Sequence, residues 1–125
     1  MRRDARFRAR PAVASHLRMP YVLVILRAGA NASEERVHAR AHERFISSLI
    51  EQNLVLLGGS LVVPLGDAYA AYVLRCHDVE EARQIAAEDP FAVHDVVRPE
   101  CVEWELVGIN PDAIDPSVVV RPDDG

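Results

Sequence analysis

The order in which apolar and amphipathic segments follow one another is the feature that most narrows what this chain can fold into. A continuous run of β-branched and aromatic residues at 21–26 is typical of a buried strand. Three further segments have the composition or alternation of strands, and two segments between them have helical periodicity. The strands are expected at residues 21–26, 54–63, 69–75 and 102–107, and the helices at 34–52 and 79–88.

The first predicted helix has residues that favour helix ends at both of its termini. Ser33 is a good N-cap, and Glu34 and Glu35 follow in the first turn, where the helix dipole favours acidic side chains. Asn53 marks the expected stop, because asparagine tolerates the left-handed conformation that often ends a helix.

The second predicted helix begins at a capping box. Asp78 and Glu81 have the Asp-x-x-Glu spacing of that motif. Pro90 is expected to end this helix, since the residue before a proline avoids the α region. A turn is expected over residues 64–67, which contain a proline, a glycine and an aspartate.

The β-α-β-β-α-β order predicts a single α+β domain with the ferredoxin-like fold. Right-handed crossovers place both helices on one face of a four-stranded antiparallel sheet. The other face then presents apolar strand residues to water, and a large exposed apolar patch is a mark of an interface. We therefore expect a homodimer in which two copies pack sheet to sheet.

The two ends of the chain differ in composition from this central part. Residues 1–18 are rich in arginine without a sustained apolar face, so they fit a disordered basic arm or a targeting presequence. A third interpretation, which we prefer, is that translation begins at Met19, where the first strand follows at once. We therefore expect a domain at residues 19–109 and a loose tail at 110–125, in which residues 118–120 can pair with a sheet edge.

Charge and cysteine content restrict the partners. Residues 1–18 hold six arginines against one aspartate, whereas the remaining 107 residues hold eight arginines against eighteen acidic residues. Because nucleic-acid binding depends on neutralising phosphates, such an acidic domain argues against nucleic acid as the main partner. No apolar run approaches the roughly 18 residues that cross a bilayer, so we expect no membrane contact. Two cysteines, Cys76 and Cys101, make no disulfide framework and favour a reducing cytoplasm.

Missing residue types exclude several kinds of enzyme. The chain has no lysine, which excludes a Schiff-base lysine, pyridoxal phosphate chemistry and a P-loop ATP site. It also lacks the G-x-G-x-x-G dinucleotide fingerprint and the G-x-S-x-G nucleophile elbow. We therefore expect a small-molecule substrate or ligand that is bound without a cofactor.

His42 lies on the apolar face of the first predicted helix, where a leucine would be expected. Helical spacing places it with Phe45, Ile46 and Leu49, whereas Glu43 falls on the opposite side. A polar ring at such a position must form a hydrogen bond or face a cavity. It is either a core histidine bonded to a backbone carbonyl or a general acid or base, because histidine titrates near neutral pH.

A metal site is a third possibility for the same helix. His38 and His42 are four residues apart, so both imidazoles lie on one side of the helix. A third ligand is needed, and the candidates are His94, Asp89 and Asp95. The spacing is common by chance and the glutamate of H-E-x-x-H is missing, so we expect no metal.

The Asp89-Pro90-Phe91 segment follows the second predicted helix. In one interpretation it is only a helix stop, with Asp89 solvated and Phe91 packed in the core. In the other, the proline directs Asp89 back between the two helices toward His42. An aspartate bonded to one imidazole nitrogen fixes the tautomer and raises the basicity of the other nitrogen.

These segments together resemble the YciI-like (YCII-related) family over residues 20–107. The similarity runs through H-x-x-F-I-x-x-L-I-x-x-x-L-V-L-L-G-G-S, G-D-x-Y-x-x-Y-V-L, E-E-A-R-x-x-A-x-x-D-P-F and V-x-W-E-L. The resemblance implies a dimeric α-β barrel built on the ferredoxin-like fold. It also implies a His–Asp pair that lines a pocket, here His42 and Asp89.

Two departures from the family pattern concern this expected pocket. The family often has glycine–proline after the second strand where this chain has Gly59-Ser60, and a glycine after Asp-Pro-Phe where it has His94-Asp95. We expect these changes to alter the polarity of the pocket. Four residues are candidates for substrate contact: Ser60, His94, Arg27 and Phe91.

The favoured hypothesis is a cofactor-independent small enzyme in which His42 transfers a proton and Asp89 orients it. The reaction would be of the isomerase, lyase or dehydrochlorinase type, on a small cyclic or aromatic substrate. The alternative is a non-catalytic dimeric module that binds a small ligand or docks a partner. An open pocket beside a His42–Asp89 contact favours the enzyme, and a filled core favours the module.

Overall fold

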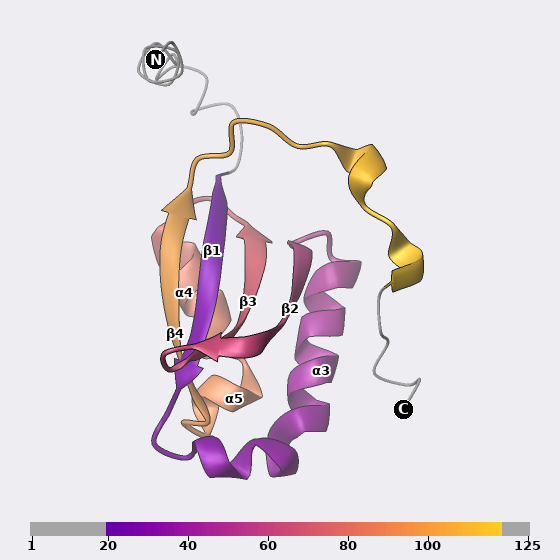
Figure 1. The fold of residues 1–125 in the computed structure, drawn as a ribbon. Helices are drawn as coiled ribbons and strands as arrows, with labels where there is room; N and C mark the ends of the chain where they lie inside the picture. The colour runs from indigo at the N-terminus through magenta and orange to yellow at the C-terminus, as the bar shows by residue number, and fades with distance from the viewer. Residues whose placement is uncertain (1–19, 119–125) are drawn as a thin grey trace.

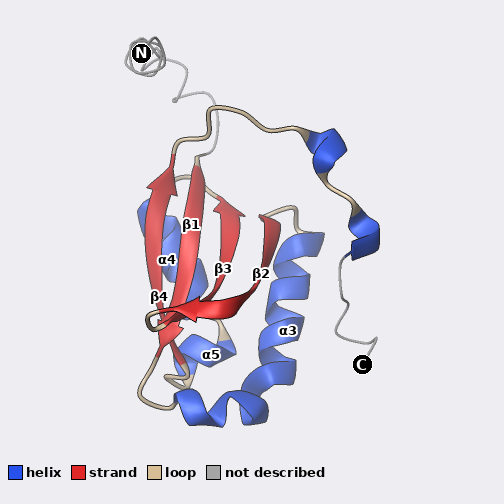
Figure 2. Cartoon of the chain, viewed as in Figure 1, coloured by secondary structure: helices blue, strands red, loops and turns tan. Residues whose placement is uncertain are grey.

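A four-stranded antiparallel sheet organises the chain, in the strand order β2-β3-β1-β4. The structure is a computed structural model that describes residues 20–118 (Figure 1). Its strands are β1 (Tyr21–Ala28), β2 (Val55–Leu65), β3 (Ala68–Arg75) and β4 (Val97–Trp104), and its α-helices are α3 (Glu35–Glu51), α4 (Val79–Ala87) and α5 (Pro90–Val93). Short 3₁₀ helices lie at η1 (Ala32–Glu34), η2 (Pro111–Ala113) and η3 (Pro116–Val118). The strand order and the helices between the strands confirm the predicted α+β ferredoxin-like fold (Figure 2).

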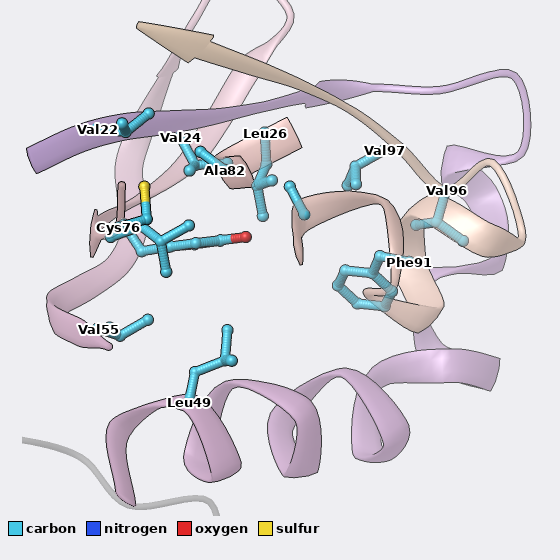
Figure 3. Packing of buried hydrophobic residues seen from close by; sticks show 13 residues of the cluster. Val22, Val24, Leu26, Leu49, Val55, Cys76, Ala82, Phe91, Val96 and Val97 are labelled. Carbon is cyan, nitrogen blue, oxygen red and sulfur yellow. The ribbon is translucent and has the colours of Figure 1, made fainter. Parts of the chain in front are cut away.

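One face of the sheet forms the core together with the helices. Val22, Val24 and Leu26 alternate along β1 and are buried, as a half-buried strand requires. Figure 3 shows them pointing toward the side where Leu49 of α3 and Phe91 of α5 lie. The helices therefore cover the same face of the sheet.

The other face of the sheet presents a row of apolar side chains. Leu23 is paired with Val73 on one side and with Val102 on the other, and Val73 is paired with Leu57. We call these four residues the open face. Leu57 and Val102 are 55% and 45% exposed, whereas Val73 is 5% exposed, so the apolar surface that the strand pattern predicts is present at Leu57 and Val102.

The last strand lies earlier in the chain than the sequence predicted. It runs over Val97–Trp104 instead of residues 102–107. Val96 and Val97 are buried and anchor its beginning. Pro99 breaks the sequence pattern of a strand, but β4 pairs with β1 alone, and an edge strand tolerates a proline.

One predicted helix end is wrong in detail and another is confirmed. Ser33 is not an N-cap, because it lies inside η1; Glu34 precedes α3 without a side-chain cap. The predicted end of the second helix before Pro90 is confirmed, since α4 ends at Ala87, and Pro90 begins a separate helix. This proline occupies the first turn of the additional helix α5, where the N–H that proline lacks would have no partner anyway.

Other local predictions are confirmed. Asn53 follows α3 with a φ of 61°, the left-handed conformation of a helix stop. The side chain of Asp78 accepts a hydrogen bond from the Glu81 N–H at 2.8 Å, which is the expected cap of α4. The turn between β2 and β3 is shorter than predicted, since residues 66–67 form it and Pro64 belongs to the edge strand β2.

The interpretations of residues 1–18 and of a strand at 119–120 lie outside the described residues, whereas residue 118 closes η3 and is not in a strand. Within residues 20–118, no helix has both the length and the apolar character needed to span a membrane.

The loop after β1 is held tightly against the turn before β4. The Gly29 N–H donates to the Val96 carbonyl at 2.9 Å, and the Asn31 N–H donates to the Asp95 carbonyl at 2.8 Å. A Cβ on Gly29 would overlap the carbonyl oxygen of Asp95. Only glycine fits this close approach, which sets the start of α3 against the corner between α5 and β4.

Replacing this glycine tests the importance of the close approach. Gly29→Ala is expected to lower the free energy of unfolding by about 1–3 kcal/mol, because the new Cβ meets a backbone oxygen that cannot turn aside. Gly59→Ala is the control, since a Cβ there meets nothing within 4 Å, and we expect a change within about 0.5 kcal/mol. Urea denaturation measures both, and equal losses would contradict the steric argument.

The two thiols are expected to differ in reactivity. Burial raises the pKa of Cys76 to about 11, and its Sγ donates to the Asp78 carbonyl at 3.3 Å. Cys101 is only half-buried, although burial raises its pKa as well. Ellman's reagent at neutral pH should therefore label Cys101 in the folded chain and Cys76 only after denaturation. Rapid labelling of folded Cys101→Ser would show that the Cys76 thiol is accessible.

Candidate functional site

Asp89 is a fully buried carboxylate at the corner between α4 and α5. Its exposed fraction is 0%, and it is the only charged or polar residue among the described ones that is classed as buried. It is the N-cap of α5: its Oδ1 accepts from the Phe91 N–H at 2.9 Å, and Pro90 follows at the first helical position. The Asp-Pro-Phe sequence therefore builds its own cap, and the carboxylate is turned inward.

His42 meets this carboxylate from α3. Its Nδ1 lies 2.9 Å from both Oδ1 and Oδ2 of Asp89, so the predicted contact across 47 residues is present. The imidazole side chain is 19% exposed, in contrast to the enclosed carboxylate. Because Nδ1–H donates to Asp89, Nε2 is the nitrogen left for another partner, and no described residue hydrogen-bonds to it.

Phe91 holds the plane of the imidazole. The rings of His42 and Phe91 are stacked with centroids 4.1 Å apart and an angle of 6° between their planes. Phe91 is itself buried, and its N–H is bonded to Asp89. One tripeptide therefore supplies the carboxylate that fixes the ring nitrogen and the aromatic surface that fixes the ring plane. Phe91 was predicted as a substrate contact, and the structure places it against His42.

His94 lies beside His38 and not beside His42. The rings of His38 and His94 are stacked with centroids 3.9 Å apart and nearly parallel planes. His38 also approaches Glu34, with Nε2 3.7 Å from Oε1. Parallel stacking does not converge the ring nitrogens on one point. Among residues 20–118, no group of three or more His, Cys, Asp or Glu side chains is arranged to hold a metal ion.

Arg27 lies away from the His42–Asp89 pair. It follows Leu26 on β1, whose buried side chain faces the helices, so Arg27 belongs to the opposite face of the sheet. There it donates to Asp67 at 2.8 Å and to Glu100 at 2.7 Å. The hydrogen bond and the positive charge of Arg27 lower the pKa of Asp67. The structure thus gives Arg27 the role of tying the β2–β3 turn to β4.

Ser60 lies on the helix-facing side of the sheet. It is paired with Ala70, which packs against the core, and Gly58 two residues earlier is paired with Tyr72. Ser60 is exposed, and the hydrogen bonds of His42 within the described residues go to Asp89 and not to Ser60. The structure therefore brings this candidate to the same face as the His–Asp pair without joining it to the pair.

Two tyrosines of β3, Tyr69 and Tyr72, were not predicted as site residues from the sequence. The hydroxyl oxygens of Tyr69 and Tyr72 are buried and have no hydrogen-bond partner among the described residues. Burial raises the pKa of Tyr72, and the Asp89 carboxylate raises it further. Burial, Glu35 and Asp89 raise the pKa of Tyr69 in the same way. The signal in the sequence was the Tyr-x-x-Tyr spacing. In a regular strand, residues three apart face opposite sides of the sheet, so only knowledge of a bulge would place both tyrosines on one side.

Two surface hollows lie elsewhere, along β4. Their volumes are about 460 and 400 Å³, and both are lined by Arg83, Arg98, Pro99 and Cys101. Neither hollow is lined by His42.

Comparisons with known proteins agree with the fold. No protein-family model and no curated protein sequence matches the chain. Among solved structures, the fold is similar to 5-chloro-2-hydroxyhydroquinone dehydrochlorinase (TftG) from Burkholderia phenoliruptrix AC1100, in its complex with 2,5-dihydroxybenzoquinone. The TM-score is 0.53 and the identity 13%, and the match covers 67% of this chain and 93% of that one. At such low identity the likeness establishes a shared fold.

Substitutions at Asp89 separate its two bonds. Asp89→Ala removes the cap of α5 and the partner of His42, so we expect unfolding to become easier by about 2–4 kcal/mol. Asp89→Asn keeps an oxygen that can accept from Phe91 and should cost clearly less. Chemical denaturation compares the two variants. Equal losses would mean that the cap contributes nothing to stability.

Proposed function

We propose that this chain is a YciI-like protein in which the His42–Asp89 pair transfers a proton on a small cyclic or aromatic substrate, without a cofactor. The observation that carries the proposal is the position of Nδ1, which is 2.9 Å from both oxygens of a carboxylate that is 0% exposed. A histidine bonded in this way presents one defined nitrogen, Nε2, to a reacting molecule.

Each residue of the pair has a distinct task in this mechanism. Asp89 holds the tautomer in which Nδ1 carries the proton, and it stabilises the positive ring that forms when Nε2 accepts a second one. His42 takes a proton from a carbon or hydroxyl group of the substrate. In an isomerisation it returns that proton to another atom; in an elimination the electron pair of the broken C–H bond forms a double bond and the leaving group departs with its own pair.

The fold supports this substrate class. The dehydrochlorinase of similar fold is named for a chlorinated hydroxyhydroquinone and was solved with a dihydroxybenzoquinone, both small cyclic molecules. In addition, the residues that the family resemblance assigns to the pair, His42 and Asp89, are in contact. We extend the class of small oxygenated rings to this chain, and we place its reaction among the lyases and isomerases.

The open face supports a homodimer as the working form. The open face, Leu23, Leu57, Val73 and Val102, is an apolar row across all four strands, and none of the helices within residues 20–118 lies over it (Figure 2). A second copy packed on the same row would remove this surface from water, and a two-fold axis makes the patch complementary to itself. We propose this sheet-to-sheet dimer, formed by the domain over residues 19–109 in the cytoplasm.

A non-catalytic ligand-binding module is the second candidate. It is favoured by the position of the two hollows along β4, which are lined by Arg83 and Arg98 rather than by His42. In that case a small anion would bind beside the arginines, and the His42–Asp89 contact would serve only to hold α3 against α5.

Hydrogen exchange into a substrate tests the catalytic proposal. The folded chain is incubated in D₂O with a panel of hydroxyquinones, phenols and cyclic diketones, and loss of C–H signals is followed by NMR. We expect His42→Ala to reduce the exchange rate by a factor of about 10²–10⁴ while the chain stays folded. His77→Ala, which removes an exposed histidine, is the matched control and should keep the rate. A His42→Ala variant as active as the control would contradict the role of His42.

The dimer is tested by charging the open face. Leu57→Asp should shift the chain from dimer to monomer in sedimentation or light scattering, because a carboxylate would be buried between the sheets. Val37→Asp is the control, since Val37 is 75% exposed on α3. A wild-type monomer, or a dimer that Leu57→Asp leaves intact, would refute this arrangement.

A further inference from the structure

Tyr69 and Tyr72 each carry a buried hydroxyl that the described chain does not use. Tyr72 is 3% exposed, and the hydroxyl oxygens of both residues are closed off from solvent without a hydrogen-bond partner. Buried polar groups in folded proteins are nearly always paired, and each exception calls for an explanation. These are the only two such side-chain atoms among the described residues, and both come from one strand.

A bulge brings the two tyrosines to the same side of the sheet. Tyr72 is opposite Val24, which faces the helices. Three residues earlier, Tyr69 would face the other way in a regular strand, but the register of β1 with β3 shifts between Leu26 and Arg27. Tyr69 consequently packs against the core as well.

Both tyrosines belong to or pack against the buried cluster that contains Phe91, whose ring is stacked on His42. The negative charge of Asp89 acts on each tyrosine, and Glu35 at the start of α3 acts on Tyr69. The two phenol groups therefore lie on the helix-facing side of the sheet, and His42 reaches the same side from α3.

We propose that the Tyr69 and Tyr72 hydroxyls donate hydrogen bonds to one oxygen of the substrate, which assigns to the site phenols and cyclic carbonyl compounds. This inference rests on the proposed function. When His42 takes a proton from such a compound, the electron pair left behind moves onto that oxygen as a phenolate or enolate. Two donors already in place stabilise this charge where it develops.

The environment of the tyrosines suits donors and not bases. Burial and the Asp89 charge raise the pKa of both, so both keep their protons at neutral pH. No described side chain accepts from them, so their O–H groups are free for a guest. If these side chains served only to fill the core, phenylalanine would fill nearly the same volume and would bury no unpaired hydroxyl.

The ligand must reach hydroxyls that are enclosed in the empty chain, and α3 offers the route. Leu49, near the C-terminal end of α3, is the one buried residue of this helix, whereas Ala39, Phe45 and Ile46 are partly buried where they pack against the core. His42, two turns before Leu49, is the partly exposed member of the site. A small outward movement of the first half of α3 would admit a ring between His42 and the tyrosines.

The test measures binding of 4-nitrophenol, with nitrobenzene as the probe that lacks the hydroxyl. We expect wild-type protein to bind 4-nitrophenol saturably by absorbance titration and calorimetry. Tyr69→Phe and Tyr72→Phe should each lose about tenfold or more in affinity for it, whereas nitrobenzene binding is unchanged. Tyr21→Phe is the matched control, because Tyr21 is the third tyrosine of the chain and its hydroxyl is not among the buried unpaired atoms.

The melting temperature Tm separates a ligand-binding hydroxyl from a structural one, because only the loss of a structural hydroxyl lowers Tm. Tyr72→Phe should keep or raise Tm, since it removes a hydroxyl that has no partner. A fall in Tm with unchanged 4-nitrophenol affinity would show a structural hydroxyl and overturn the proposal, as would the absence of saturable binding to wild type.

The outcomes also separate this inference from the proposed function. If His42→Ala abolishes proton exchange but both phenylalanine variants bind 4-nitrophenol like wild type, the donor pair is refuted and the catalytic histidine stands. If the phenylalanine variants lose binding while His42→Ala keeps exchange, the donor pair stands and the catalytic histidine is refuted.

Discussion

The buried carboxylate of Asp89 is the constraint on which the rest of the structure depends. A charge or polar group removed from water must find hydrogen bonds within the protein, and Asp89 finds them in two elements at once. The Phe91 N–H, at 2.9 Å, belongs to α5, and His42 Nδ1, also at 2.9 Å, belongs to α3. The carboxylate therefore joins the corner after α4 to a helix that has little other burial. The same bonds that hold α3 in place are those that orient the imidazole.

The sheet divides the chain into a chemical face and an assembly face. On the helix side, Val22, Val24 and Leu26 form the core, and the His42–Asp89 pair sits where α3 and α5 meet over it. On the other side an apolar row runs across all four strands and ends near the ion pairs that Arg27 makes with Asp67 and Glu100. A period of two along each strand gives both faces at once, so a proposed dimer and a proposed site need not compete for surface.

Between α3 and the sheet, stability favours complete packing, whereas the proposed activity requires polar groups that are free to bind a ligand. A fully packed core would have no unpaired hydroxyls and would bury more of α3 than Leu49. Among residues 20–118, the hydroxyl oxygens of Tyr69 and Tyr72 are instead buried without a hydrogen-bond partner. Departures from good packing, such as unpaired buried hydroxyls, are concentrated at functional sites. Polar groups selected to bind a ligand gain their hydrogen bonds only when the ligand is present.

The sequence alone was enough for the fold class and for the two residues of the pair. Periodicity showed strands and helices in the ferredoxin-like order, and helical spacing showed that His42 replaces an apolar residue on the buried face of α3. The Asp78 cap followed from local chemistry as well. These features depend on neighbours a few residues away, so they can be read from the chain in order.

Only the tertiary structure decided which of the candidates meet. It joined His42 to Asp89 across 47 residues, moved β4 to Val97–Trp104, and placed Arg27 on the face away from the pair. It also turned Tyr69 inward through a bulge that no local pattern announces. Strand register, bulges and the approach of helices are set by contacts between distant segments. The energies of those contacts depend on shapes that exist only once the chain has folded.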